Sequence, residues 1–194
     1  MNVVKDLRQQ AGLTQQQLAK LAGVTTLYVI RAEQFLHPNL DKLSRVLASV
    51  NGQDSQDSMT AHQIEDTYVA QREDHVSRTR ALFYDDPRHE SRVARALDYA
   101  LNEFTPPVGL LREERQKLHP FTLFREYLFD QYELPTSQIK FAAYTGVHPA
   151  ALSALENSYS TIETDSPVAK MLTNTLLLDV NQLALLQVMC DRCL

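Results

Sequence analysis

The sequence has 194 residues, a net charge of −5 and only five glycines. Nucleotide-binding α/β sheets use glycine in tight turns and phosphate loops, so the composition disfavours them. Leu, Ala, Gln, Glu and Arg dominate most segments, which predicts an all-α fold, and the 44% hydrophobic content suffices for a packed core. Residues 1–50 carry a net charge of +3, whereas 51–119 and 120–194 each carry −4. The positive charge is therefore concentrated at the N-terminus.

The cysteine content and the start of the chain indicate a soluble, cytoplasmic protein. Cys190 and Cys193 are the only cysteines, and two cysteines cannot form a disulfide framework. The first residues lack the long apolar core of a signal peptide. No apolar run reaches the roughly 18–20 residues that a membrane-spanning helix requires.

Apolar periodicity and helix-capping residues predict helices along the whole chain. In the N-terminal part we expect them over 2–11, 15–22 and 26–34, with a fourth opened by Pro38 and Asn39. A polar linker over 51–58 follows, then helices over 61–84, 89–104 and 110–118. The last part predicts helices over 121–132, 138–145, 149–157, 167–178 and 182–192, with a loop at 158–166. We divide the chain into an N-terminal domain (1–52), a helical connector (53–119) and a C-terminal domain (120–194).

The segment QQQLAKLAGVTTLYVIRAEQ, residues 15–34, has the pattern of a helix-turn-helix. Two helices that cross closely need a short turn, and Gly23 suits that turn. Thr14 followed by Gln17 forms a capping box for the first helix. The positions that must fill the wedge between the helices are small or apolar: Leu18, Ala19, Val24, Val29 and Ala32.

Residues 7–47 resemble the lambda repressor/Cro-like family, also called the XRE family. The resemblance rests on LRQQAGLTQQQLAKLAGVTTLYVIRAEQ followed by PNLDKLSRVL, and it covers about a quarter of the chain. It implies a compact domain of four or five helices whose third helix enters the DNA major groove.

The resemblance also implies roles for individual side chains. Thr25, Thr26, Leu27 and Arg31 would face base edges, and Arg31 could grip a guanine while Leu27 meets a thymine methyl. Gln15, Tyr28 and Gln34 would contact the DNA backbone. Leu27 stands where many relatives carry a polar residue, so the preferred DNA sequence does not follow from the resemblance.

A shift of 123 residues aligns a second, degenerate helix-turn-helix with the first. Gly23 then corresponds to Gly146, Gln15 to Gln138, and Glu33 to Glu156. The second copy lies in the acidic part of the chain, and two functions remain open for it. It could contact DNA through Gln138, Lys140 and His148. Alternatively, its alanine-rich third helix and the apolar tail could mediate self-association or partner docking; the tail residues are Leu183, Leu185, Leu186, Val188 and Met189.

The sequence predicts neither an enzyme nor a cofactor. It contains no nucleophile elbow, Walker loop, H-E-x-x-H motif or paired C-x-x-C motif, so we expect no catalytic residues and no metal. The resulting hypothesis is a sequence-specific transcriptional regulator, a phage or prophage-type repressor that binds double-stranded operator DNA as a homodimer. The alternative is an antitoxin or adaptor whose acidic C-terminal half binds a protein partner.

Overall fold

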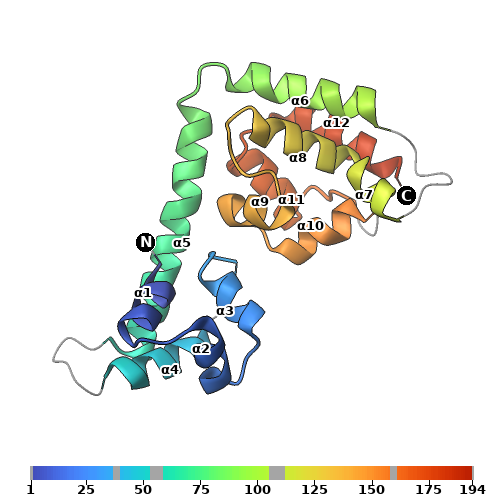
Figure 1. Ribbon diagram of the computed structural model, residues 1–194. Coiled ribbons are helices and arrows are strands. Elements are labelled where there is room, and N and C mark those ends of the chain that lie inside the picture. Colours follow the sequence, from blue (N-terminus) through green and yellow to red (C-terminus); the bar gives the residue numbers. More distant parts are fainter. Residues whose placement is uncertain (1, 37–39, 53–58, 105–111, 158–160, 194) are drawn as a thin grey trace. The chain divides into compact units, whose positions relative to one another are not determined.

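The computed structural model describes the chain except residues 1, 37–39, 53–58, 105–111, 158–160 and 194. In the described residues all regular structure is helical, which confirms the all-α expectation (Figure 1). The helices fall into two compact units, the N-terminal unit (Met1–His75) and the C-terminal unit (Val76–Leu194). The three-part division made from the sequence stays a prediction. None of the described helices is long and apolar enough to cross a membrane.

The N-terminal unit contains four short helices and the first half of a long one. These are α1 (Val3–Gln10), α2 (Gln15–Ala22), α3 (Thr26–Ala32), α4 (Asp41–Asn51) and α5 (Ala61–Tyr84). α2 packs against both α3 and α4, and α1 packs against α4. Ile64 and Tyr68 of α5 are fully buried in the same core as Leu18 and Leu47. The N-terminal half of α5 is therefore part of this unit's core.

Polar contacts also tie α5 to the ends of shorter helices in the N-terminal unit. The Gln71 side chain accepts a hydrogen bond from the backbone N–H of Val3 at 2.8 Å. Glu65 accepts one from the Ser44 hydroxyl at 2.6 Å. The expected opening of α4 by Pro38 and Asn39 lies outside the described residues, as does most of the expected linker.

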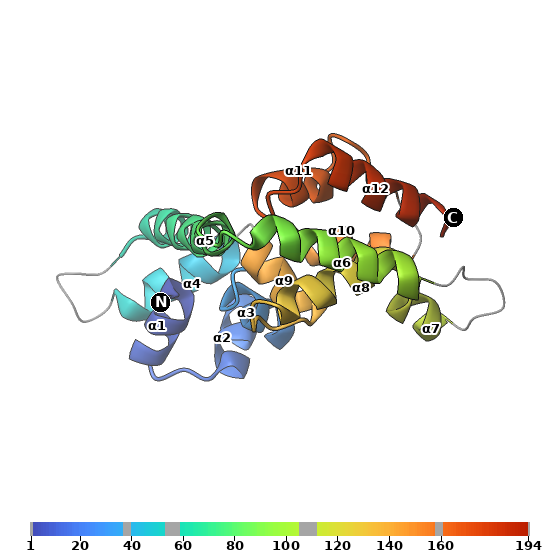
Figure 2. The same ribbon diagram turned by 90° about the horizontal axis from the view of Figure 1, so that it is seen from above.

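The C-terminal unit contains the end of α5 and all later helices. These are α6 (His89–Glu103), α7 (Arg112–Lys117), α8 (Pro120–Asp130), α9 (Gln138–Thr145), α10 (Pro149–Glu156), α11 (Pro167–Asn174) and α12 (Val180–Asp191). α6, α8 and α12 lie against one another, as both ribbon views show (Figures 1 and 2). Aromatic side chains fill much of this core, and the fully buried ones include Phe83, Phe121, Phe124, Phe129 and Phe141.

A polar cluster joins the start of α6 to the ends of α8 and α11. One ring nitrogen of His89 is 2.8 Å from the Tyr132 hydroxyl, and the other is 2.7 Å from the carbonyl oxygen of Leu176. Arg92 forms an ion pair with Asp86 at 2.9 Å and lies over the Tyr132 ring. Burial lowers the pKa of His89, so its neutral form is favoured in the core.

Candidate nucleic-acid interface

Capping residues set the limits of α2 and the start of α3. The Thr14 hydroxyl accepts from the Gln17 N–H at 3.2 Å, and the Thr14 N–H donates to the Gln17 side chain at 2.8 Å. Gly23 ends α2 in the left-handed conformation with φ 62°, which glycine adopts without steric cost. Thr25 then caps α3, because its hydroxyl accepts from the Tyr28 N–H. These contacts confirm the predicted capping box and the turn at Gly23.

The wedge between α2 and α3 is filled as the sequence pattern predicts. Leu18, Ala19, Val29 and Ala32 are buried, and Val24 packs against them while partly exposed. Small residues at positions 19 and 32 permit a close approach of the two helices. The orientation of α3 is therefore fixed by the core rather than by its exposed residues.

A partly buried polar group also holds α3, and we call it the N-terminal clamp: Arg8, Gln15 and Glu33. The Arg8 Nε forms an ion pair with one carboxylate oxygen of Glu33 at 2.6 Å, and the Gln15 amide donates to the other oxygen at 2.8 Å. Arg8 also donates to the carbonyl oxygen of Leu13 at 2.6 Å. The clamp thus links α1, the start of α2 and the end of α3.

α3 ends at Ala32, two residues earlier than the sequence predicted. The chain reverses there because Phe35 adopts the left-handed conformation with φ 59°, and the Leu36 N–H bonds back to the carbonyl oxygen of Arg31 at 2.8 Å. Arg72 of α5 donates to the Phe35 carbonyl, and the Phe35 ring contacts the Tyr68 ring. Residues of α5 thereby hold a strained position at the end of α3.

The predicted DNA-contacting side chains lie along α3 and its two ends. Thr25 and Leu27 are exposed, and Leu27 leaves half of its surface uncovered. Four others are half-buried: Thr26, Tyr28, Arg31 and Gln34. Leu27 and Arg31 are four residues apart and so share a face of the helix. Within the described residues the buried Nε of Arg31 has no hydrogen-bond partner.

The electrostatics of the N-terminal unit are mixed. The whole unit, Met1–His75, has a net charge of −2, although residues 1–50 carry +3. Arg8 is neutralised in the clamp, while Lys5, Lys20 and Lys42 are exposed. Burial and the negative charge of Asp41 raise the pKa of Tyr28, so its hydroxyl stays protonated at neutral pH. Any attraction for phosphate therefore depends on α1–α4.

Comparison with known families identifies this part of the chain. A family profile described as helix-turn-helix matches residues 4–49, about a quarter of the chain. Residues 4–49 are a helix-turn-helix domain of the XRE kind. This part of the chain is thus similar to the DNA-binding domains of XRE-type transcription regulators. The searches of curated proteins and of solved structures find no match.

The C-terminal unit contains a polar group with the same contacts as those in the helix-turn-helix domain, and we call it the C-terminal clamp: Arg125, Gln138 and Glu156. Arg125 pairs with one oxygen of Glu156 at 2.7 Å, and Gln138 donates to the other at 2.8 Å. Arg125 also donates to the carbonyl of Thr136, which precedes the N-cap of α9 as Leu13 precedes that of α2. Neither Arg8 nor Arg125 was predicted from the sequence.

The three candidate DNA contacts of the C-terminal unit have different environments. Gln138 is engaged in the clamp, Lys140 is exposed on α9, and the His148 ring caps α10 by accepting from the Ala150 N–H. The partly or fully exposed residues of α10 include no cation: they are Pro149, Ala150, Ala151, Ser153 and Ala154.

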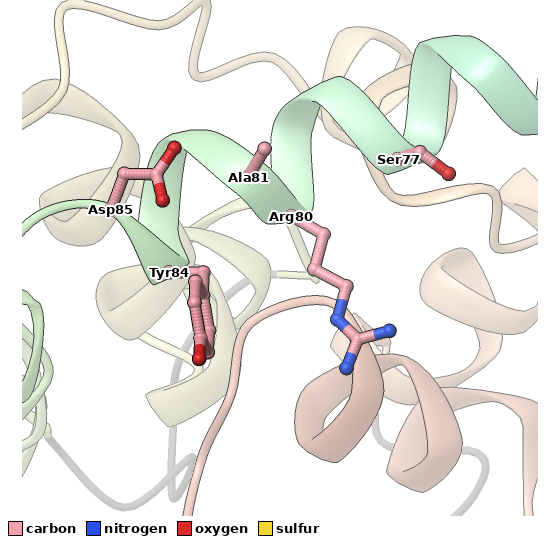
Figure 3. Close-up of a pocket in the computed structure, with 5 residues that line it drawn as sticks. All are labelled: Ser77, Arg80, Ala81, Tyr84 and Asp85. Atoms are coloured by element: carbon pink, nitrogen blue, oxygen red, sulfur yellow. The ribbon is translucent and has the colours of Figure 1, made fainter.

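One hollow among the described residues lies along the end of α5. A hollow of about 440 Å³ is lined by Ser77, Arg80, Ala81, Tyr84 and Asp85, all from one stretch at the end of α5 (Figure 3). Side chains from a single helix do not surround a ligand. Cys190 and Cys193 are buried free thiols, and burial raises the pKa of Cys193 to about 11, so this thiol is a poor nucleophile at neutral pH.

Proposed function

We propose that the protein is a sequence-specific repressor of the phage or prophage type that occupies operator DNA with α3 in the major groove. The observation that carries this proposal is the face of α3 that bears Leu27 and Arg31, held in place by the N-terminal clamp. A rigid support is what a base-contacting helix requires, because specificity depends on side chains placed within a fraction of an ångström.

The side chains on and beside α3 divide into two groups by their chemistry. Arg31 carries a planar fork that matches the O6 and N7 atoms of guanine, and Leu27 offers an apolar surface to a thymine methyl. Thr25 and Thr26 lie at the start of the helix, where base edges are closest. Tyr28 and Gln34 would contact the DNA backbone and set the register.

Gln15 differs from the usual phosphate contact because its amide already donates to Glu33. Its backbone N–H is the first of α2 and has no partner within the helix, as for any helix start. We therefore assign the phosphate contact to this N–H group and the positive end of α2, with the side chain oriented by the clamp.

Replacing Arg31 with alanine should weaken specific operator binding by roughly 1–3 kcal/mol, as expected for the loss of a bidentate contact to guanine. The loss should appear only with operators that contain the guanine contacted by Arg31. Gel-shift titration of the purified protein against its own promoter region measures the effect.

The matched control is Arg45→Ala, since Arg45 is an exposed arginine of the same unit that pairs with Asp41 at 2.7 Å. Arg45→Ala should change the affinity for all DNA sequences about equally, and by less than Arg31→Ala changes the affinity for the operator. Equal affinities of Arg31→Ala and wild type for the operator would contradict the role of Arg31.

We further propose that α9 and α10 are a second helix-turn-helix. Gly146 ends α9 in the left-handed conformation with φ 74°, as Gly23 ends α2 with φ 62°. The two clamps support the same conclusion, since an arginine, a glutamine and a glutamate make equivalent contacts in both units.

The second copy serves as a scaffold for self-association rather than as a DNA-contacting domain. The C-terminal unit has a net charge of −3, and Lys140 is the one cation among its candidate contacts. Lys140→Ala should therefore leave both operator affinity and its salt dependence unchanged in a titration at several salt concentrations. A lower slope of log affinity against log salt would instead assign Lys140 to a phosphate.

A further inference from the structure

The turn that ends α3 uses an aromatic residue where helices usually carry glycine. The Phe35 N–H donates to the carbonyl oxygen of Ala32 at 3.1 Å, and the Leu36 N–H donates to that of Arg31 at 2.8 Å. This is the pattern of a Schellman motif, whose residue in the left-handed conformation is most often glycine. Phe35 takes that position with φ 59°, although its Cβ makes the conformation unfavourable. The turn therefore needs support from elsewhere in the unit.

Three residues of α5 supply this support, and we call them the α5 cluster: Tyr68, Arg72 and His75. The Arg72 Nε donates to the carbonyl oxygen of Phe35 at 3.1 Å. The centroid of the Phe35 ring lies 5.5 Å from that of Tyr68 and 5.6 Å from that of His75. The three residues are spaced by four and three positions, so they share one face of α5. The α5 cluster thus contacts both the backbone and the ring of Phe35.

The turn at Phe35 bears directly on the part of α3 that carries Arg31. Arg31 lies in the last turn of the helix, and its carbonyl oxygen accepts from both the Gln34 N–H and the Leu36 N–H. A different backbone conformation at Phe35 would break the second of these bonds and move the end of the helix. Contacts to base edges require side chains placed within a fraction of an ångström. Contacts to phosphate are less sensitive, because charge attraction acts over several ångströms.

We propose that Arg72 is a positioning residue for DNA recognition, which holds Arg31 in register with its base through the turn at Phe35. The α5 cluster lies outside residues 4–49, so the part of the chain that determines sequence specificity extends beyond the matched family profile. Arg72 itself makes no contact with DNA in this role, because its Nε donates to a backbone carbonyl. The inference rests on the proposed operator-binding function, since it concerns the contact between Arg31 and a base edge.

Arg72→Met in the full chain tests the assignment, because methionine keeps an unbranched side chain but cannot donate a hydrogen bond. Fluorescence anisotropy measures binding to the operator and to a scrambled duplex of equal length, at several salt concentrations. The operator affinity should fall roughly tenfold, within the range for a weakened base contact, while the affinity for the scrambled duplex stays unchanged. The slope of log affinity against log salt should also stay unchanged. Equal losses on both duplexes with a lower slope would overturn the proposal, because Arg72 would then contact a phosphate.

Glycine at position 35 provides a second test that does not depend on the charge of Arg72. Phe35→Gly permits the left-handed turn without support. Adding Arg72→Met to Phe35→Gly should therefore reduce the ratio of operator to scrambled affinity by less than about threefold, well below its effect in the wild type. The same loss in both backgrounds would show that Arg72 acts independently of Phe35, which would overturn the proposal.

Circular dichroism checks that each variant is folded at the temperature of the titration. If Arg72→Met lowers the folded fraction, His75→Leu takes its place, because it removes one side of the stack on Phe35 and keeps the arginine. His75→Leu should lower the ratio of operator to scrambled affinity by a smaller factor. An unchanged ratio in this folded variant would then overturn the role of the α5 cluster.

Arg80→Met is the matched control, because it removes the same charge from the same helix at an exposed position outside the α5 cluster. It should leave the affinity ratio unchanged. A wild type that binds both duplexes equally would contradict the operator-binding function itself. A selective wild type with an equally selective Arg72→Met variant would contradict only the positioning role of Arg72.

Discussion

Replacing Arg125 with methionine should destabilise the C-terminal unit by about 3–5 kcal/mol, the usual cost of leaving one partner of a buried ion pair unpaired. Arg125 and Glu156 are almost fully inaccessible, with side chains 3% and 0% exposed. Without the guanidinium, the Glu156 carboxylate would keep only the amide of Gln138. The carbonyl of Thr136 would lose its donor as well. Urea unfolding followed by circular dichroism measures the loss.

Two further variants test whether the loss of stability comes from the unpaired buried charge. The double variant Arg125→Met with Glu156→Leu should recover part of the loss, because it removes the unpaired charge. Arg8→Met breaks the equivalent pair of the N-terminal unit, where the side chains are 11% and 7% exposed. It should cost less, since solvent reaches that pair more easily. A loss under 1 kcal/mol for Arg125→Met would show that the C-terminal clamp contributes little.

The clamps show why the sequence predicted part of the site and not all of it. Gln15 and Glu33 align with Gln138 and Glu156 at one shift of 123 residues, because the helices between them have similar lengths. The arginines are related by a shift of 117 instead, because α8 is three residues longer than α1 and the segment that joins α8 to α9 is three residues longer than the one joining α1 to α2. A comparison at a single shift therefore misses them, although a glutamate repeated at a buried position indicates that a cation should lie nearby.

Most helix limits follow from local sequence signals. The observed limits differ from the predicted ones where contacts with distant residues set them. The limits of α2, α5 and α9 agree with the sequence prediction, because caps, glycines and apolar periodicity are local. The end of α3 depends on Phe35, whose left-handed backbone is held by Arg72, 37 positions along the chain. No pattern within α3 could show that contact. Likewise, only tertiary packing decides which apolar side chains of α12 are buried, namely Leu183, Leu186 and Met189.

Acidification should destabilise the C-terminal unit through His119, which stands at the N-cap of α8. This side chain is 2% exposed, and burial lowers its pKa from 6.5 to about 4. Between these two values the unfolded chain binds a proton that the folded chain does not. The free energy of unfolding therefore falls as the pH drops from 6.5 to 4, by roughly 3 kcal/mol in total. Above pH 6.5 this contribution is fully present. His89, whose pKa burial also lowers, acts in the same direction.

His119→Asn separates this titration from the structural role of the residue. The His119 ring accepts a hydrogen bond from the Phe121 N–H at 3.2 Å, and asparagine is a good N-cap that does not titrate. Urea unfolding at pH 7 and at pH 4.5 should therefore show a smaller difference for the variant than for the wild type. The variant should lose some stability at pH 7, because asparagine fills less of the buried space. An unchanged difference between the two pH values would mean that His119 keeps an ordinary pKa in the folded chain.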